Sequence, residues 1–383
     1  MPISRLPYVQ HRSVEGHRGS IFALAVTGNG AILASGGSHG TRLWNVADMS
    51  AIEHPSPTGI RGATVVVIWA RQTDEAHDVL YAGTQNRYFY CWRQKEGIFE
   101  ETFAIQTPDI AEVTAMALDS TNNRLCLCTR NDFVQSWAIS KDPVSGTWMP
   151  TNIFSRKLTN FAPQAITFAA FDNSQDRDII VLGFHNSGPV YTIRGKTGET
   201  ASAWLVGAQI GDAAFYWKDG VFCVDDPQSG PALFRLSDQV KSKMYHVDHE
   251  RTSGRPRKVC FGEQGTTVIC GSDHGCVYVF DTRSGERLAT LSVGSTEWVQ
   301  VVTTAEVDNV SVIFAAQTRA MDCSEDIFIW KRAQPAVKMS SQGDSIAWAV
   351  KALVVLGCLA FIYQNLEPVV SALPIMQLGA RRN

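Results

Sequence analysis

A pattern that returns along the chain is the feature that most constrains its fold. Residues 16–46 read in order as a Gly-His pair, an apolar run, an Asn-Gly turn, a second apolar run, a Gly-rich turn and a run that ends in Trp44. The same order returns over residues 256–283, where a Ser-Asp-His-Gly turn precedes a run that ends in Phe280. Short apolar runs separated by such turns predict antiparallel hairpins. The chain is therefore expected to repeat one β-meander.

Five weaker copies of the pattern lie between and after these two. Their strand-closing residues are Trp92, Trp137, Ile193, Phe234 and Trp330, and the mean step between all seven closing residues is about 48 positions. This step is close to the length of a β-propeller blade, which is about 40–45 residues in one large class. The sequence predicts an all-β fold, a seven-bladed β-propeller over residues 1–335. Its blades are expected near 16–46, 63–93, 111–139, 163–194, 211–236, 256–283 and 298–332.

The first and sixth copies resemble the WD-repeat (WD40) family. In that family a His, a Ser or Thr, an Asp and a strand-closing Trp form a hydrogen-bonded network within each blade. His17, Ser35 and Trp44 match three of these positions in the first copy, and His39 lies where the Asp is expected. In the sixth copy Asp273 matches, but the Gly-His pair is missing. The structural residues that the resemblance implies are His17, Ser35, Trp44, Trp92, Trp137, Asp273, Phe280 and Trp330.

Because no copy carries the complete network, several blades are expected to be held mainly by apolar packing between adjacent sheets. The seventh copy is also one strand short of the four that a blade needs. After Trp330 the chain continues with Pro335 and a polar stretch, neither of which continues a sheet. In the family, a segment placed like residues 8–14 forms the outer strand of the last blade. We expect residues 8–14 to close the ring, because an open ring would expose a hydrogen-bonding edge.

Composition argues against some partners and environments. The chain has 34 basic and 37 acidic residues, a formal net charge of −3, so it provides no basic field for nucleic acid, which is not an expected partner. Nine cysteines occur without a C-x-x-C pair, and several lie in apolar runs. This usage predicts buried thiols in a reducing compartment and not a disulfide framework or a zinc site.

Motifs that carry catalytic chemistry are scarce. The sequence has no Walker loop, no H-E-x-x-H and no dinucleotide-binding fingerprint after a strand, and we expect no G-x-S-x-G nucleophile elbow. Asp225 and Asp226 are adjacent, and neighbours in an extended segment point in opposite directions, so they are expected to form a solvated turn and not an acid–base pair. We expect a non-enzyme with no catalytic residue, no metal and no cofactor.

Basic or protonatable residues recur in the turn before the strand-closing residue. In a propeller these turns share one face, near the mouth of the central channel. Such a ring of groups would suit an acidic or phosphorylated segment of a partner protein. The alternative is that they are simply polar residues at exposed turns. The residues of this predicted binding face are His39, Arg87, Arg130, His185, His274 and Arg319.

The most apolar stretch follows a linker at residues 336–345. It covers residues 346–363, has Lys351 as its only charge, and precedes a short tail at 364–383. As a helix it would span about 27 Å, close to the thickness of the endoplasmic reticulum membrane. The sequence predicts a C-terminal α-helix that anchors the propeller to the cytosolic face of an intracellular membrane, with the endoplasmic reticulum favoured. The alternative is a helix packed on protein in a soluble cytoplasmic chain.

Three functions fit these features. The leading one is a non-catalytic scaffold that binds one or more proteins and is tethered by residues 346–363. The second is a propeller enzyme, hydrolase or lactonase-like, which would need convergent carboxylates or a metal at the channel mouth. The third is a membrane-bound exchange factor for a small GTPase, suggested only by the layout of a propeller followed by one membrane segment. A fold alone does not choose among them.

Overall fold

The computed structural model describes residues 6–56, 60–71, 78–170, 176–247, 254–318 and 324–334, with 351, 353–356 and 360. The chain divides into two compact units, Met1–Ala333 and Gln334–Asn383. In the described part of the first unit, the strands form seven four-stranded antiparallel sheets. The predicted all-β, seven-bladed propeller is therefore confirmed.

Each sheet is a meander, and the order of strands in the first six follows the sequence. The first sheet contains β2 (Ile21–Val26), β3 (Ile32–Gly37), β4 (Gly40–Asn45) and β5 (Ala51–Ile52). The second contains β6 (Thr64–Arg71), β7 (Asp78–Thr84), β8 (Tyr88–Lys95) and β9 (Ile98–Gln106). The third contains β10 (Val113–Asp119), β11 (Arg124–Thr129), β12 (Phe133–Lys141) and β13 (Trp148–Lys157). The fourth contains β14 (Pro163–Phe168), β15 (Ile179–Gly183), β16 (Pro189–Ile193) and β17 (Thr200–Leu205).

The remaining three sheets complete the ring. The fifth contains β18 (Asp212–Tyr216), β19 (Val221–Asp226), β20 (Gly230–Arg235) and β21 (Lys241–Met244). The sixth contains β22 (Val259–Gly262), β23 (Thr267–Cys270), β24 (Cys276–Asp281) and β25 (Arg287–Ser292). The seventh contains β26 (Trp298–Val307), β27 (Val310–Thr318), β28 (Ser324–Arg332) and β1 (Tyr8–Arg18). Two short 3-10 helices, Trp217–Asp219 and Glu263–Gly265, follow β18 and β22.

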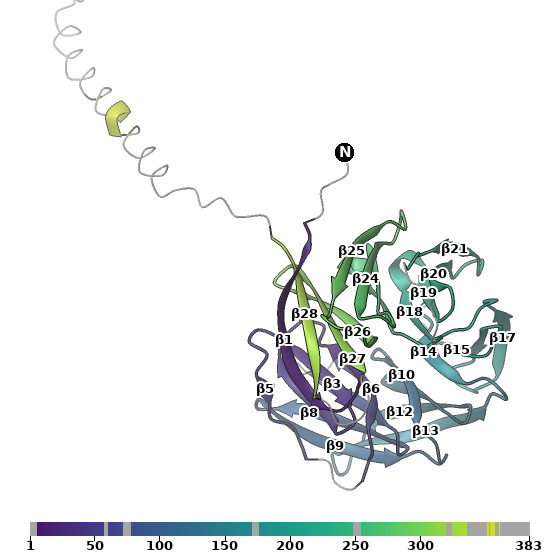
Figure 1. The fold of residues 1–383 in the computed structure, drawn as a ribbon. Coiled ribbons are helices and arrows are strands. Elements are labelled where there is room, and N and C mark those ends of the chain that lie inside the picture. The colour runs from purple at the N-terminus through teal and green to yellow at the C-terminus, as the bar shows by residue number, and fades with distance from the viewer. Residues whose placement is uncertain are drawn as a thin grey trace, which may run out of the picture. The chain divides into compact units, whose positions relative to one another are not determined.

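The first strands of the sheets surround the axis of the ring. Each contacts the first strand of the next sheet, from β2 through β6, β10, β14, β18, β22 and β26 and back to β2. The sheets accordingly follow one another around a centre in Figure 1. Seven clusters of buried apolar side chains lie between neighbouring sheets; in one, Leu43 of the first sheet packs with Leu80 and Trp92 of the second. Second strands such as β7 and β11 are buried on both faces, which explains their continuous apolar runs.

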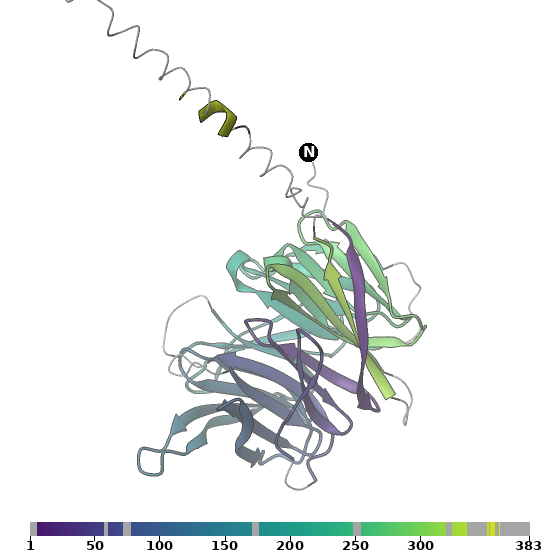
Figure 2. The ribbon, with the colours of Figure 1, turned by 90° about the vertical axis from the view of Figure 1, so that its left-hand side faces the viewer.

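The two ends of the propeller sequence meet in the seventh sheet. β1 pairs antiparallel with β28, from Tyr8 opposite Arg332 to Arg18 opposite Ser324, so the strand expected over residues 8–14 runs on to Arg18. Figure 2 shows β1, in purple, lying along the yellow-green β28. The Tyr8 hydroxyl donates a hydrogen bond to Glu263 Oε1 of the sixth blade at 2.6 Å, and the Arg332 guanidinium pairs with the same carboxylate. The closing strand is thus tied to two blades.

In the second unit, residues 353–356 are helical, as the sequence predicts for this region. Leu353, Val354, Val355 and Leu356 are between 58% and 69% exposed. The rest of the predicted span 346–363 lies almost entirely outside the described residues. Within the residues that are described, no helix is long and apolar enough to cross a membrane.

Removing residues 1–14 should lower the melting temperature of the whole propeller in one cooperative step. The deletion removes most of β1, including the buried Tyr8, and exposes the edge of β28. We expect a fall of at least about 5 °C by differential scanning calorimetry. A deletion of residues 1–5, which stops short of the strand, is the matched control and should melt like the full chain. Identical curves for both deletions would show that β1 does not stabilise the ring.

Candidate functional site

One end of the blades is built from two kinds of segment. These are the lead-in loop before each first strand and the turn between the second and third strands. In the first four blades a backbone N–H of the turn donates to a carbonyl beside the start of the first strand, so the two segments lie together. The bonds are Ser38 to Ser20, Gln85 to Ala63, Arg130 to Glu112 and Phe184 to Ala162, at 2.9–3.0 Å. We call this end of the propeller the mouth face.

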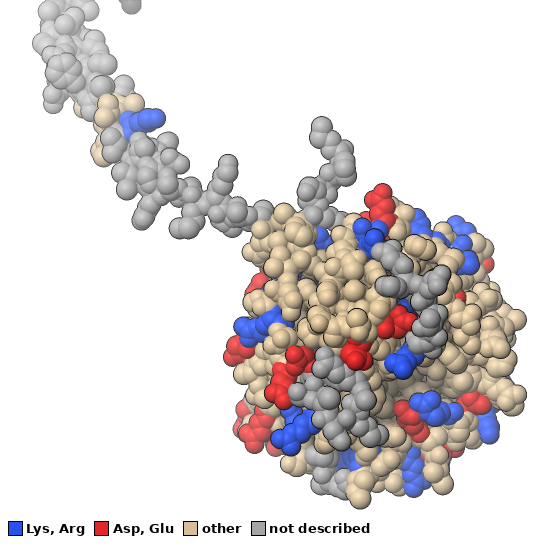
Figure 3. All heavy atoms as spheres, viewed as in Figure 1, with Lys and Arg blue, Asp and Glu red and all other residues tan. Residues whose placement is uncertain are grey.

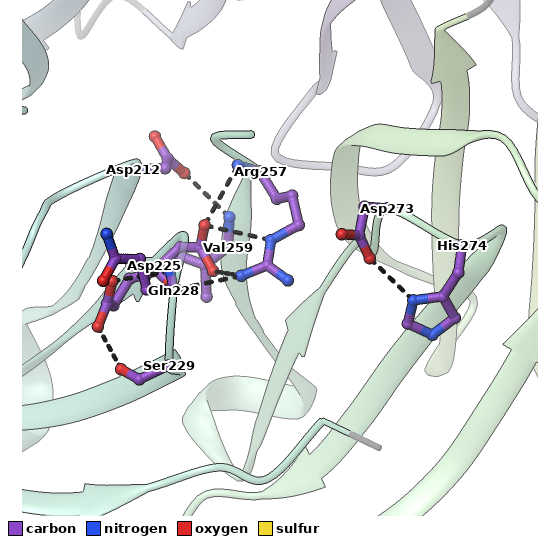
Figure 4. Close-up of polar contacts among 9 residues, drawn as sticks. Asp212, Asp225, Gln228, Ser229, Arg257, Val259, Asp273 and His274 are labelled. Atoms are coloured by element: carbon purple, nitrogen blue, oxygen red, sulfur yellow. Dashed lines mark hydrogen bonds and ion pairs between the residues drawn. The ribbon is translucent and has the colours of Figure 1, made fainter. Parts of the chain in front are cut away.

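Five of the six residues predicted to bind a partner lie in turns of the mouth face, and Arg319 lies outside the described residues. His39 and His185 are exposed, and Arg87 donates to Gln106 Oε1 at 3.3 Å. Two of the predicted binding residues face carboxylates. Arg130 Nε is 2.5 Å from Glu112 Oε2, and His274 Nδ1 is 2.9 Å from Asp273 Oδ1 (Figure 4).

The charge of the propeller surface is accordingly mixed. Acidic and basic side chains are interspersed over the side of the molecule seen in Figure 3. The predicted basic residues of the mouth face do not form a continuous positive ring, because Glu112 and Asp273 stand beside two of them. Recognition by bulk positive charge is therefore a weaker basis for binding than a specific pocket.

A cavity of about 410 Å³ opens at the mouth of the central channel. All seven blades contribute to its wall, including Phe22, Gln85, Gln164, Lys258 and Trp298. Below it a second cavity, about 220 Å³, is lined mainly by apolar residues of the first strands. Of the five predicted binding residues that the structure describes, only Arg130 lines the upper cavity. Several other lining residues, such as Phe22, Gln164 and Lys258, lie within two positions of the start of a first strand, so the predicted starts of these strands could have identified them.

A buried ion pair fixes one side of this cavity. Arg257, in the lead-in loop of the sixth blade, is bonded to the Asp225 carboxylate of β19 through its guanidinium and through its backbone N–H. The side chains of Arg257 and Asp225 are 1% and 0% exposed. Asp226 turns the other way, where its carboxylate accepts hydrogen bonds from Ser229 and from the Gln228 N–H (Figure 4). The expectation that Asp225 and Asp226 form a solvated turn is wrong, because both are buried in β19.

A second ion pair stands beside it. Lys258 Nζ is 2.7 Å from Asp212 Oδ1, and the other oxygen of Asp212 accepts the Val259 N–H at 2.9 Å. Burial raises the pKa of Asp212, an effect that the neighbouring ammonium opposes. The Asp212 side chain is 6% exposed, whereas that of Lys258 is 42% exposed. The ammonium of this pair is therefore the group that solvent reaches, and the carboxylate is buried.

The first blade contains three of the four members of the network that the WD resemblance implies. Trp44 Nε1 donates to Ser35 Oγ at 2.9 Å, and Ser35 Oγ lies 2.8 Å from His17 Nε2. His17 lies near the end of β1, just before the turn that leads into β2, so the network ties the mouth end of β1 to β4. His17 Nδ1 is buried without a partner among the described residues. His39, which stands where the family has an Asp, instead contacts the carbonyl of Arg18.

The second blade makes the same connection with different groups. Arg61, in the lead-in loop, forms a bidentate pair with Glu101 at 2.5 and 2.8 Å. Trp92 Nε1 donates to the same carboxylate at 3.4 Å. The Arg61 guanidinium also lies over the Tyr90 ring, 5.1 Å from its centroid. Arg61 therefore occupies the role of His17, and a search for Gly-His pairs could not have found it.

The third blade uses a third combination. Gln135 receives the Trp137 N–H at 3.1 Å through its carbonyl oxygen and donates its amide to Asp109 of the lead-in loop at 2.7 Å. In the sixth and seventh blades the closing residues stack on aromatic rings, Phe280 on Tyr278 and Trp330 on Phe328. All of these closing residues are buried.

Comparison with known families agrees with this geometry. The model of the family described as WD domain, G-beta repeat, matches residues 9–45, which include His17, Ser35 and Trp44. The chain is a seven-bladed propeller with a WD repeat. No curated protein matches it. The other blades keep the four-stranded architecture, and the second and third hold their closing Trp through side chains other than those of the WD network.

One sequence motif at the mouth face resembles a catalytic motif, but its structural setting does not fit catalysis. The expectation of no G-x-S-x-G nucleophile elbow is wrong as to the letters, because residues 36–40 read Gly-Gly-Ser-His-Gly. That elbow requires a turn from a strand into a helix, whereas Ser38 lies between β3 and β4. Over the described ranges, no group of three His, Cys, Asp or Glu side chains is arranged to hold a metal ion.

His17 should make the propeller sensitive to acid. Burial, with Arg42 and His39 nearby, lowers the pKa of His17 to about 4 from an ordinary value of about 6.5. Between these values the unfolded chain binds the extra proton, so the free energy of unfolding falls as the pH falls from 6.5 towards 4. Urea denaturation should show a loss of about 2.5 kcal/mol from this group between about pH 7.5 and pH 4.5.

The comparison variant is His17→Gln, which lacks the titrating group. It should be less stable at neutral pH because the link to Ser35 is altered, but its stability should fall less on acidification. Equal acid responses in the two proteins would remove His17 as the cause.

Proposed function

We propose that this propeller is a non-catalytic protein-interaction scaffold whose partner binds on the mouth face. One observation carries the proposal: Ile60 and Ile110, in the lead-in loops of the second and third blades, are 89% and 87% exposed. Single apolar residues on a surface are common, but two large ones in neighbouring loops beside a cavity favour a contact site. WD-repeat propellers commonly bind other proteins, which agrees with this placement.

Both isoleucines sit on anchored backbone. Ile60 precedes Arg61, which is 6% exposed and held by Glu101, and the Ile60 carbonyl accepts the Asn86 amide at 3.3 Å. Ile110 follows Asp109, which is held by Gln135. A contact residue that is ordered before binding loses less conformational entropy in the complex. The mouth face therefore has the rigidity that a binding surface needs.

The carboxylates near the cavity support a scaffold more than a hydrolase. Asp212 and Asp225 each accept hydrogen bonds from a cation and from a backbone N–H. These contacts hold the lead-in loop of the sixth blade in place. A general base needs a lone pair directed at its substrate, whereas these oxygens face groups of the protein itself.

A membrane tether forms the second part of the proposal. The side chains of residues 353–356 are all large, apolar and more than half exposed, on every side of one helical turn. A helix that is apolar all round requires an apolar environment. Together with the single charge of residues 346–363, this favours insertion in a bilayer. We place the propeller on the cytosolic face of an intracellular membrane, with the endoplasmic reticulum favoured by the short span.

The double variant Ile60→Asp, Ile110→Asp should lose its protein partner without unfolding. Affinity purification from detergent extracts and mass spectrometry should recover a stoichiometric partner with the wild type and at least about tenfold less with the variant. Val144→Asp is the matched control, because Val144 is 93% exposed in the turn between β12 and β13, at the other end of its blade. No stoichiometric partner, or equal recovery with both variants, would contradict the proposal.

The tether is tested by carbonate extraction of membranes from cells that express the full chain. The full chain should stay in the membrane pellet, because carbonate does not release a helix buried in the bilayer. A chain ending at Asp344 should be recovered in the supernatant. If the two chains are released equally, residues 346–363 do not act as an anchor.

A further inference from the structure

Two cations of the upper cavity, which we call the mouth cavity, are more exposed to solvent than the carboxylates that pair with them. The Arg130 side chain is 65% exposed and its partner Glu112 is 19% exposed. Lys258 and Asp212 show the same order, 42% against 6%. Arg130, Lys258 and Glu112 line the upper cavity, whereas Asp212 lines the lower one, so an entering group meets both of these cations but only one of their carboxylates. The cavity is locally suited to an anion although the pairs are neutral overall.

Uncharged donors add to this preference. Gln300 Oε1 accepts the Thr318 hydroxyl at 2.8 Å, which leaves the Gln300 amide nitrogen as the group that can donate at the cavity wall. Thr114 also lines the cavity, and its hydroxyl is buried without a hydrogen-bond partner in the part of the chain that the structure describes. Buried hydroxyls are usually paired, so the Thr114 hydroxyl is an unused polar group of the cavity wall.

We propose that the mouth cavity binds a carboxylate side chain from an acidic segment of the partner protein. The inference rests on the proposed scaffold function and names the chemistry of its partner. Arg130 belongs to the third blade and Lys258 to the lead-in loop of the sixth, so they approach the cavity from opposite sides of the ring. Phe22 and Trp298 supply apolar wall between polar groups, and limited access of water strengthens a charged contact.

A carboxylate suits this arrangement better than a phosphoryl group. The two ion pairs, Arg130 with Glu112 and Lys258 with Asp212, have no net charge. The cavity can therefore accept one negative charge by hydrogen bonding to the exposed cations, but it has no surplus positive charge to neutralise a second. A dianion would add a second charge near Glu112. The monoanion is therefore the occupant to which the proposal commits, and the phosphorylated form becomes an arm of the test.

The test uses a phage-displayed library of random peptides panned on the detergent-solubilised full chain. Enriched peptides should share an Asp or Glu, and the affinity of a synthetic enriched peptide should fall with added salt. Arg130→Gln and Lys258→Gln should each weaken that peptide at least about tenfold. Replacing its acidic residue by Gln should do the same, and replacing it by phosphoserine should not improve binding.

Lys218→Gln is the matched control, because Lys218 is an exposed lysine in the turn after β18, whereas Asp212 starts that strand at the cavity. It should bind the peptide like the wild type, and the melting temperature of every variant shows that the ring is intact. No enrichment, enrichment of peptides without acids, or equal effects of Lys258→Gln and Lys218→Gln would overturn the proposal. A cellular partner retained equally by wild type and Lys258→Gln would leave the scaffold standing and remove only the carboxylate site.

Discussion

The pairing of β1 with β28 is the contact on which the rest of the propeller depends. It is the longest-range link in the ring, since the carbonyl of Leu6 accepts a hydrogen bond from Arg332, 326 positions away. Until it forms, the seventh sheet lacks its outer strand, and its edge is open to other chains. Because the upper cavity takes wall residues from all seven blades, a closed ring is also the condition for that cavity to exist.

Local signals made the architecture predictable. Turns and apolar runs are set by neighbouring residues, so their repetition gave the number of blades and placed the turns before the closing strands at one end. The end of β1 at Arg18 was harder to predict, because the length of β1 is set by its pairing with β28 and not by the residues of β1 itself. Asp225 shows the limit most clearly: two adjacent carboxylates resemble an exposed turn until Arg257, 32 positions away, is brought against one of them.

The predicted binding face depends on local signals, whereas the observed cavity depends on contacts between residues far apart in the sequence. Alternation of strand direction places His39 and His185 on the mouth face, and sequence alone could establish that. Whether a side chain reaches the channel depends on how close it lies to the start of a first strand, as Lys258 does before β22. Its charge environment depends on carboxylates from other loops or blades. Arg130 could be predicted because it lies in a recognisable turn before a strand-closing residue, and this turn is at the cavity. Lys258 lies in a lead-in loop that no local motif marks.

The networks explain how the blades could diverge without losing this surface. His17, Arg61 and Asp109 share no chemistry, yet each connects the segment before its blade's first strand to the closing Trp through one intermediate side chain. What is required is a fixed loop and not a particular residue. Ile60 and Ile110 are direct neighbours of two of these anchors. Arg61 is buried against its blade and Asp109 is half-buried, whereas the isoleucine beside each of them is exposed. The interaction that holds each loop thus also presents its apolar residue to a partner.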